Sequence, residues 1–279
     1  MGTQLKANFK KEFLAYFRTN GFTIIAASLI AIAIMTPVML VVMGALMTAM
    51  SDVYAEMGVD ITGMTYAISS NSSTAVMSSV NDLTMVALIV LLLLLNRHAG
   101  GEQRKRSVII PRSAGLTTFS YIFPKFIVYP LSAFVLGVAG MMASWFVSGL
   151  LFDVNDVPLV MAALAGALVG VCLMLYVCFH LSFGTATGLP GLSATVCIIA
   201  SFFLPFAITV ADADLVFNPF ALPLMATQAV GNGFITASER QDIIITVLIA
   251  FAIMILTYFI ALFAQNAKKI DNRGNEISL

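Results

Sequence analysis

The segment 97–125 contains seven ionic side chains, and it reads RHAGGEQRKRSVIIPRSAGLTTFSYIFPK. It combines charged residues with an apolar run, Val108 to Ile110, that is followed by a proline. Ion-pairing groups beside a small apolar patch are suited to docking a protein partner. A plain basic loop that only sets membrane topology is the alternative. The candidate docking residues are Glu102, Arg104, Arg106, Pro111, Arg112 and Lys125.

The sequence lacks the common motifs of catalysis. It has no G-x-x-x-x-G-K-[ST] phosphate loop, no H-E-x-x-H and no G-x-S-x-G. Cys172, Cys178 and Cys197 all lie inside apolar blocks, where cysteine behaves as a small hydrophobic residue. We therefore predict no catalytic, cofactor-binding or metal-binding residues in this chain, and no nucleic acid among its partners.

Two further patterns lie within apolar blocks. Methionine recurs at every fourth position from 35 to 47, and its flexible thioethers could line a pathway for an apolar or varied substrate. The alternative is that these side chains fill gaps between helices. Small residues recur at the same spacing from 162 to 170, which lets two helices approach closely, either within one subunit or between two. The residues are Met35, Met39, Met43 and Met47 for the first pattern, and Ala162, Gly166 and Gly170 for the second.

Membrane-spanning helices must position these residues. Hydrophobic residues make up 60% of the 279 residues and charged residues only 10%, against about 45–50% and about 25% in soluble domains. The apolar residues form blocks of about 20 or more, the length that crosses a bilayer as a helix. The predicted spans are 22–50, 75–95, 126–151, 158–183, 191–210 and 243–264. Asp82 makes the second span the least regular, and we expect it either to face a wet outer cavity or to mark a short, tilted helix.

The distribution of charge predicts the orientation. All Lys and Arg residues except Arg240 lie before the first span, between the second and third spans, or after the sixth. By the positive-inside rule, both termini are cytoplasmic. Residues 5–20 place aromatic and apolar side chains at helical spacing with lysines off that stripe, which predicts an amphipathic interfacial helix; a simple basic anchor is the alternative. The predicted fold is thus an all-α integral membrane protein, one transmembrane domain over 1–279.

With these features in place, the chain resembles the permease subunits of type 2 ABC exporters. The resemblance is carried by KKEFLAYFRTNGF at residues 10–22, by Glu102, by the Ile-Ile-Pro of residues 109–111 and by Lys125. Arg106-Ser107-Val108 stands where the family often has Gly-Thr-Leu. The resemblance covers essentially the whole chain.

The resemblance implies partners and a location. A separate nucleotide-binding ATPase subunit, which carries ATP and Mg, would dock on the cytoplasmic coupling loop 97–125. One chain supplies half of the spans of a full exporter, so a second permease, as a homodimer or a heterodimer, is implied. The outer loop 211–240 would hold a re-entrant or interfacial segment. Membrane lipid would surround the chain, and the expected location is the bacterial cytoplasmic membrane.

Two other classes of function fit the same hydropathy. A membrane scaffold, sensor or immunity protein would bind a partner without transporting anything. An ion-coupled carrier needs a titratable group near the middle of the bilayer, and among the predicted spans only Asp82 is a candidate. His180 lies toward the cytoplasmic end of the fourth span, where we expect a packed residue rather than a proton relay. Secondary transport is therefore the weaker alternative.

Overall fold

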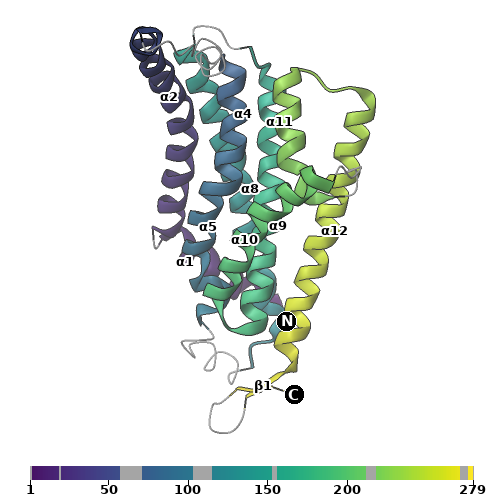
Figure 1. Cartoon of the computed structure of the whole chain (residues 1–279). Coiled ribbons are helices and arrows are strands. Elements are labelled where there is room, and N and C mark those ends of the chain that lie inside the picture. The colour runs from purple at the N-terminus through teal and green to yellow at the C-terminus, as the bar shows by residue number, and fades with distance from the viewer. Residues whose placement is uncertain are drawn as a thin grey trace.

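The computed structural model describes residues 2–18, 20–56, 71–102, 115–152, 156–211, 218–270 and 276–278, which form a bundle of long helices (Figure 1). Five helical stretches in these ranges are long and apolar enough to cross a membrane. The chain is therefore a helical, multi-pass membrane protein, while the fifth predicted span, 191–210, stays a prediction. The five stretches are Gly21–Met50, Ser72–Leu95, Thr118–Leu151, Leu159–Thr187 and Ala237–Ala267.

The first helix, α1 (Gly2–Arg18), precedes the first span and lies at one end of the bundle (Figure 1). Its buried residues are polar or aromatic and recur at helical spacing: Asn8, Glu12 and Tyr16. Phe13 and Phe17 instead remain exposed. The helix thus turns a polar stripe toward the protein and leaves apolar side chains outside, as a helix at a membrane surface would.

The first span belongs to α2 (Gly21–Glu56), and the second is a composite of α4 (Ser72–Asp82), the π-helical turn η1 (Leu83–Ala87) and α5 (Leu88–Leu95). Asn71 caps α4 by accepting a hydrogen bond from the backbone N–H of Thr74 at 3.0 Å. The π-helical turn begins directly after Asp82, whose carboxylate accepts a 2.6 Å hydrogen bond from the Thr36 hydroxyl of α2. The second span is consequently continuous, with its irregularity next to the charged residue.

The centre of the bundle is α9 (Leu159–Thr187), which contacts α8 (Thr118–Leu151) and the later helices α10, α11 and α12. Helix α8 begins before the predicted span, since the Thr117 hydroxyl caps its first turn and proline is tolerated at positions 124 and 130. In its most apolar stretch α9 is 67% buried, whereas the corresponding figures are 28% for α2 and 22% for α12. These two outer helices therefore present most of their side chains to the surroundings.

The fifth predicted span, 191–210, coincides with one helix, and two further helical elements lie in the predicted outer loop 211–240. Helix α10 (Pro190–Ala211) rises from the end of the bundle that holds α1, while η3 (Pro219–Ala221) and α11 (Leu222–Asn232) occupy the opposite half (Figure 1). The side chains of Leu222, Ala226 and Val230 are buried, and α11 packs against α4 and α9. The segment predicted as an outer re-entrant element thus includes a helix packed inside the bundle.

The chain then returns through α12 (Ala237–Ala267) to the end that holds α1. Where the apolar sequence stops, a two-stranded antiparallel hairpin follows, formed by β1 (Lys268–Ile270) and β2 (Glu276–Ser278). This hairpin is a small addition to the predicted all-helical fold. Figure 1 places both ends of the chain at the same end of the bundle.

Candidate functional site

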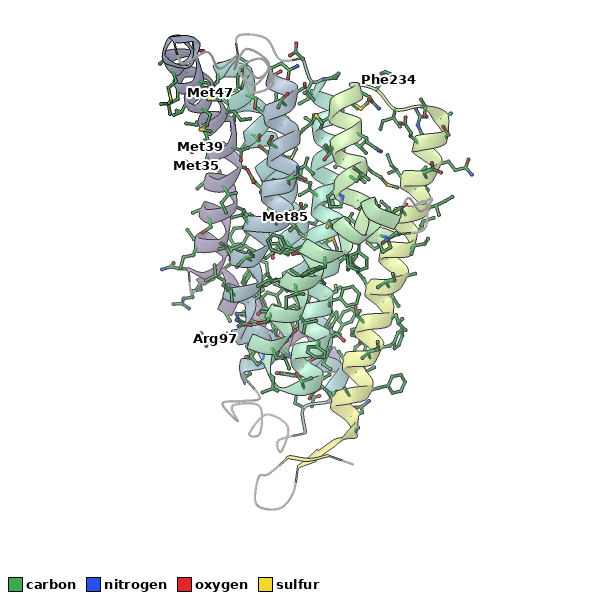
Figure 2. The ribbon with its side chains drawn as sticks, in the orientation of Figure 1. Met35, Met39, Met47, Met85, Arg97 and Phe234 are labelled. Atoms are coloured by element: carbon green, nitrogen blue, oxygen red, sulfur yellow. The ribbon has the colours of Figure 1, made fainter. Side chains whose placement is uncertain are left out.

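A buried cluster of polar side chains joins three elements at the end of the bundle that holds α1. They are α1 itself, the π-helical turn η2 (Arg97–Gly101) that follows the second span, and the first turns of α8. Arg97, labelled in Figure 2, marks this end. We call the set the polar cluster; its members are Lys11, Glu12, His98, Glu102, Tyr121, Lys125 and Tyr129.

The strongest interaction in the polar cluster is the ion pair between Lys125 and Glu102. The Lys125 ammonium donates a 2.7 Å hydrogen bond to Glu102 Oε2, and the lysine side chain is only 1% exposed. The same ammonium donates to the carbonyl of His98 and to the hydroxyl of Tyr121, each at 3.2 Å. These three hydrogen bonds use all three donors of the ammonium group, so each N–H of the buried charge has an acceptor in the protein.

Glu102 is held in its charged form. Burial alone would raise the pKa of its carboxyl, but the adjacent Lys125 ammonium, with Lys11 and the Tyr121 hydroxyl, lowers it to about 2. The Tyr121 hydroxyl donates to Glu102 Oε2 at 3.0 Å, and Lys11 lies 3.5 Å from the other oxygen. The carboxylate therefore links α1 and α8 to the end of the π-helical turn η2.

A second branch of the polar cluster runs through Tyr129. Its hydroxyl donates a 2.7 Å hydrogen bond to Glu12 Oε2 and lies 2.6 Å from His98 Nδ1. Burial, reinforced by the charge of Lys125, lowers the pKa of His98 to about 4. The imidazole is therefore neutral at pH 7, and, because the tyrosine proton is directed to Glu12, we assign the His98 proton to Nδ1.

The backbone of η2 is fixed against α9 by two glycines. Gly100 has a φ of 143°, which L-residues with side chains rarely adopt. A Cβ atom added to Gly100 would collide with the carbonyl oxygen of Gly184, and one added to Gly184 would collide with the carbonyl of Ala99. Only two residues without side chains allow this close approach. The turn that carries His98 is thereby held between α8 on one side and α9 on the other.

The structure brings together only part of the predicted docking set. Glu102 and Lys125, at the two ends of the loop, form the ion pair described above. Arg104, Arg106, Pro111 and Arg112 lie outside the described residues. Sequence reasoning missed the cluster's Glu12, His98 and Tyr129; the only available signal was that Asn8, Glu12 and Tyr16 share one face of an otherwise basic helix.

The methionine pattern lies on the outside of the chain. Met35, Met39 and Met43 are 55%, 50% and 45% exposed. Figure 2 shows Met35, Met39 and Met47 along the outer edge of α2. Within this chain, then, the first three do not fill gaps between helices, and a second protein, lipid or substrate would have to cover them.

A polar stripe runs along α4, which packs against α2, and this stripe was not predicted beyond Asp82. Thr74 and Ser78 are half-buried, Asn81 is exposed, and Asp82 is half-buried where it meets Thr36. An exposed amide and a carboxylate within a membrane-spanning helix are costly against hydrocarbon. This stripe, Thr74–Asp82, therefore requires water or another protein next to it.

The small residues of α9 pack inside the chain. A Cβ atom on Gly170 would come within 2.7 Å of the Phe134 ring of α8, and one on Gly166 within 3.2 Å of Val138. From the other side, a Cβ atom on Gly137 would come within 2.8 Å of Gly170 Cα. Ala162 is also fully buried. Of the two readings of this stripe, the arrangement favours packing within the subunit, between α8 and α9.

His180 is also enclosed by the bundle. Its Nδ1 lies 3.0 Å from the Ser193 hydroxyl of α10, and that hydroxyl donates to the His180 carbonyl at 2.9 Å. The side chain is fully buried. These contacts join α9 to α10 near the turn between them, which is a packing role.

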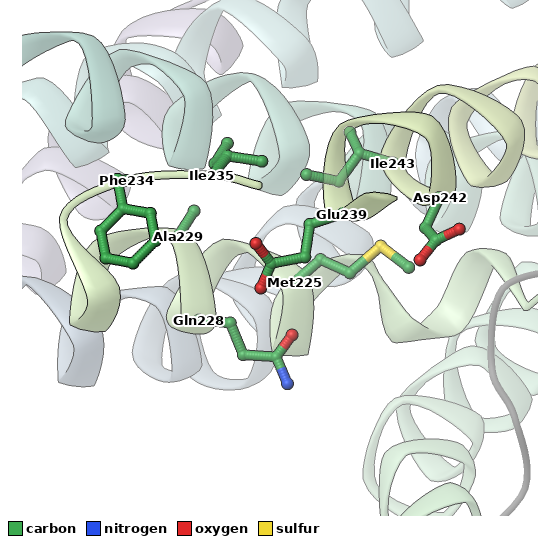
Figure 3. A pocket seen from close by; sticks show the side chains of 8 residues that line it. All are labelled: Met225, Gln228, Ala229, Phe234, Ile235, Glu239, Asp242 and Ile243. Atoms are coloured by element: carbon green, nitrogen blue, oxygen red, sulfur yellow. The ribbon is translucent and has the colours of Figure 1, made fainter. Parts of the chain in front are cut away.

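A small pocket at the opposite end of the bundle contains two carboxylates (Figure 3). Its volume of ≈ 60 Å³ is far below the roughly 300 Å³ at which ligand pockets begin. Glu239 accepts hydrogen bonds from the backbone N–H and the hydroxyl of Thr236, at 2.8 and 2.6 Å, and so caps α12. The carboxylate has a structural task, and we do not treat this pocket as a substrate site.

Comparisons with protein-family models, with curated proteins and with solved structures found no match for this chain. Within the described ranges, His, Cys, Asp and Glu form no group of three or more that could hold a metal ion. The features of the molecule that bear on function are the polar cluster, the exposed edge of α2 and α4, and the membrane-spanning helices.

Proposed function

We propose that the chain is the membrane-spanning permease subunit of a type 2 ABC exporter, driven by a separate ATPase subunit that docks on the loop 97–125. The observation that carries this proposal is the Lys125–Glu102 ion pair, since it joins the segment that follows the second span to the early turns of the third. ATP and Mg would be bound by the partner chain.

The polar cluster supplies a route for force from the loop to the helices. A partner that displaces the residues after Glu102 would pull on Lys125 of α8 and on Lys11 of α1 through the carboxylate. The same displacement would reach α9 through the contact of Gly100 with Gly184. Two carboxylates and two ammonium groups balance each other in the cluster, so it can move as a unit without leaving an unpaired buried charge.

A second permease subunit would cover the exposed edge formed by α2 and α4. Asn81 and Asp82 need polar surroundings, and the exposed methionines beside them can adapt to varied contacts. Two such edges facing each other would enclose a passage with a polar stripe and a flexible apolar stripe. This arrangement supports a dimer, formed with a second copy or with a related chain, in which the substrate moves between subunits.

The positive-inside rule then places both termini and the loop 97–125 in the cytoplasm, and we assign the protein to the bacterial cytoplasmic membrane. Export is the direction that the family resemblance implies.

Copurification and vesicle transport test the proposal. We expect an ATPase subunit to copurify with the native chain, and vesicles that contain both subunits to move substrate only with ATP and Mg. A Glu102→Gln, Lys125→Gln double variant should keep the spans but weaken ATP-dependent flux. If the ATPase is absent and the native chain binds a partner without flux, the protein is a scaffold, sensor or immunity protein.

A second candidate is supported by one contact, the 2.6 Å hydrogen bond between Thr36 and Asp82 within the spans. A carboxylate at this depth could take part in proton or cation coupling. An ion-coupled carrier would show flux driven by an ion gradient without any ATPase, and Asp82→Asn would abolish it. Flux that requires ATP and survives this substitution would contradict the carrier.

A further inference from the structure

An open groove lies between α1 and the beginning of α8. Its volume is ≈ 580 Å³. Apolar side chains of α1 and the ring of Phe123 of α8 line it, and two exposed lysines of α1 border it, Lys6 and Lys10. No acidic residue is among the described residues that line this groove. The groove thus offers an apolar floor with positive charge at its edge.

A second hollow, between α8, α9 and α12, adjoins the first. Its volume is ≈ 270 Å³, and Phe123 lines both. The lining includes Ile127 of α8, Met174 of α9 and Ile255 of α12. Tyr258 joins its wall through edge-to-face contacts with Phe123 and Phe126, at 6.2 and 5.4 Å between ring centroids. Aromatic packing therefore gives this apolar hollow a fixed wall.

The position of the two hollows determines what can reach them. The α8–α9–α12 hollow lies on membrane-spanning helices, where acyl chains are the solvent. The α1 groove lies at the end of these spans, at the level of lipid headgroups, on a helix whose Phe13 is 47% exposed. Glu12, the acidic residue of α1, is turned inward to Tyr129, so it does not neutralise the two lysines.

We propose that these two hollows form one binding site for an anionic glycerophospholipid. Its phosphate lies at Lys6 and Lys10, and one acyl chain passes Phe123 into the hollow between α8 and α12. The lipid would hold α1 against α8 next to the polar cluster, where Asn8 already donates a 2.6 Å hydrogen bond to the carbonyl of Ser120. This inference is independent of the transport proposal.

Native mass spectrometry of the full-length chain, stripped of lipid in detergent, tests the headgroup half of the site. Phosphatidylglycerol and phosphatidylcholine with identical acyl chains are the probes. We expect the native chain to retain phosphatidylglycerol more strongly, and Lys6→Gln with Lys10→Gln to lower that preference by roughly tenfold. Arg18→Gln is the matched control, because it removes a charge from the same helix outside the groove.

The acyl half is tested by filling the second hollow. Ile127→Trp should weaken retention of both lipids, whereas Leu131→Trp, one turn further along the exposed face of α8, should not. Equal retention of the two lipids by the native chain would overturn the proposal. So would an Arg18→Gln effect as large as that of the lysine pair, because attraction would then come from diffuse charge rather than from a site.

Discussion

The polar cluster and the polar stripe of α4 both place charged or amide groups in a mainly apolar protein, but they differ in how those groups are satisfied. In the polar cluster, Lys125 is 1% exposed and has a hydrogen-bond acceptor for each of its donors. On the stripe, Asn81 is exposed and Asp82 has a single described side-chain partner, Thr36.

This contrast shows which of the two regions has its polar groups satisfied within one chain. Buried charges that are paired and hydrogen-bonded are stable without help from outside. Polar groups exposed on a membrane-spanning helix are not, since hydrocarbon offers them no partner. The polar cluster can thus work as an internal connection between helices, whereas the stripe depends on water or on another subunit.

Removing the buried cation of the cluster should have the greatest consequence. Lys125→Met should destabilise the fold by up to about 3–5 kcal/mol, because the mostly buried Glu102 would lose its closest cation and keep only the half-exposed Lys11 at 3.5 Å. Adding Glu102→Gln should recover a large part of that loss. Thermal unfolding of the two single variants and the double variant in detergent measures the coupling, and strictly additive losses would show that the two side chains do not act as a pair.

The next effect comes from Gly100. Gly100→Ala should cost about 2–4 kcal/mol, since the side chain is both strained at this backbone conformation and blocked by the Gly184 carbonyl. Gly115→Ala is the control: it too has a positive φ, of 89°, but open space around it. Unfolding measurements should therefore give a clearly smaller loss for Gly115→Ala, and equal losses would mean that the contact with α9 contributes nothing.

Acid should weaken the polar cluster in a defined pH range. The pKa of His98 is about 4 in the folded chain and 6.5 in its ordinary state, so the unfolded chain binds the proton first. Stability should be complete above pH 6.5 and fall as the pH drops toward 4, by about 2 kcal/mol at pH 5. Below about pH 4.5 the lowered pKa of Glu102 adds a further loss.

A pH series of unfolding temperatures checks this prediction. His98→Gln should remove the part of the slope between pH 6.5 and 4 and keep the part below it. The outcome that contradicts the assignment is an unchanged slope in the variant, or a native chain that gains stability as the pH falls through this range.

The smallest expected effect on the single chain comes from the stripe. Asn81→Leu should change monomer stability by no more than about 0.5 kcal/mol, because the side chain is exposed. It should nevertheless weaken self-association in lipid by about 1 kcal/mol if a second copy supplies the partner of this amide. Energy transfer between labelled chains in vesicles measures association. Association unchanged by the substitution would point to water, rather than a second copy, beside Asn81.

Much of the fold follows from the sequence because long apolar runs have few alternatives in a membrane. Most ends of the spans in α2, α8, α9 and α12 were predicted to within a few residues. The largest difference is at the start of α8, which begins before the predicted span. The predicted end of the fifth span at residue 210 lies next to the end of α10, but hydropathy did not show that the following loop includes a helix packed inside the bundle. Nor could it place α11 between α4 and α9.

The candidate site was predicted in part for a related reason. Glu102 and Lys125 were both predicted as docking residues of the loop 97–125, but their direct pairing follows only from the three-dimensional arrangement. Glu12 and Tyr129 are 117 positions apart, and helical periodicity says which face a residue occupies without saying what lies opposite. In the same way, the spacing of the methionines indicated that they share one face of α2, but it did not show that this face is exposed.

The π-helical turn Leu83–Ala87 also sets the rotational phase of the second span. Such a turn holds one residue more than a regular α-helical turn, and one residue corresponds to about 100° of rotation. If the same residues formed a regular α-helix throughout, α4 would be rotated by about that angle relative to α5. Asn81 and Asp82 would then leave the edge shared with α2, so one residue of helical excess decides which way the polar stripe faces.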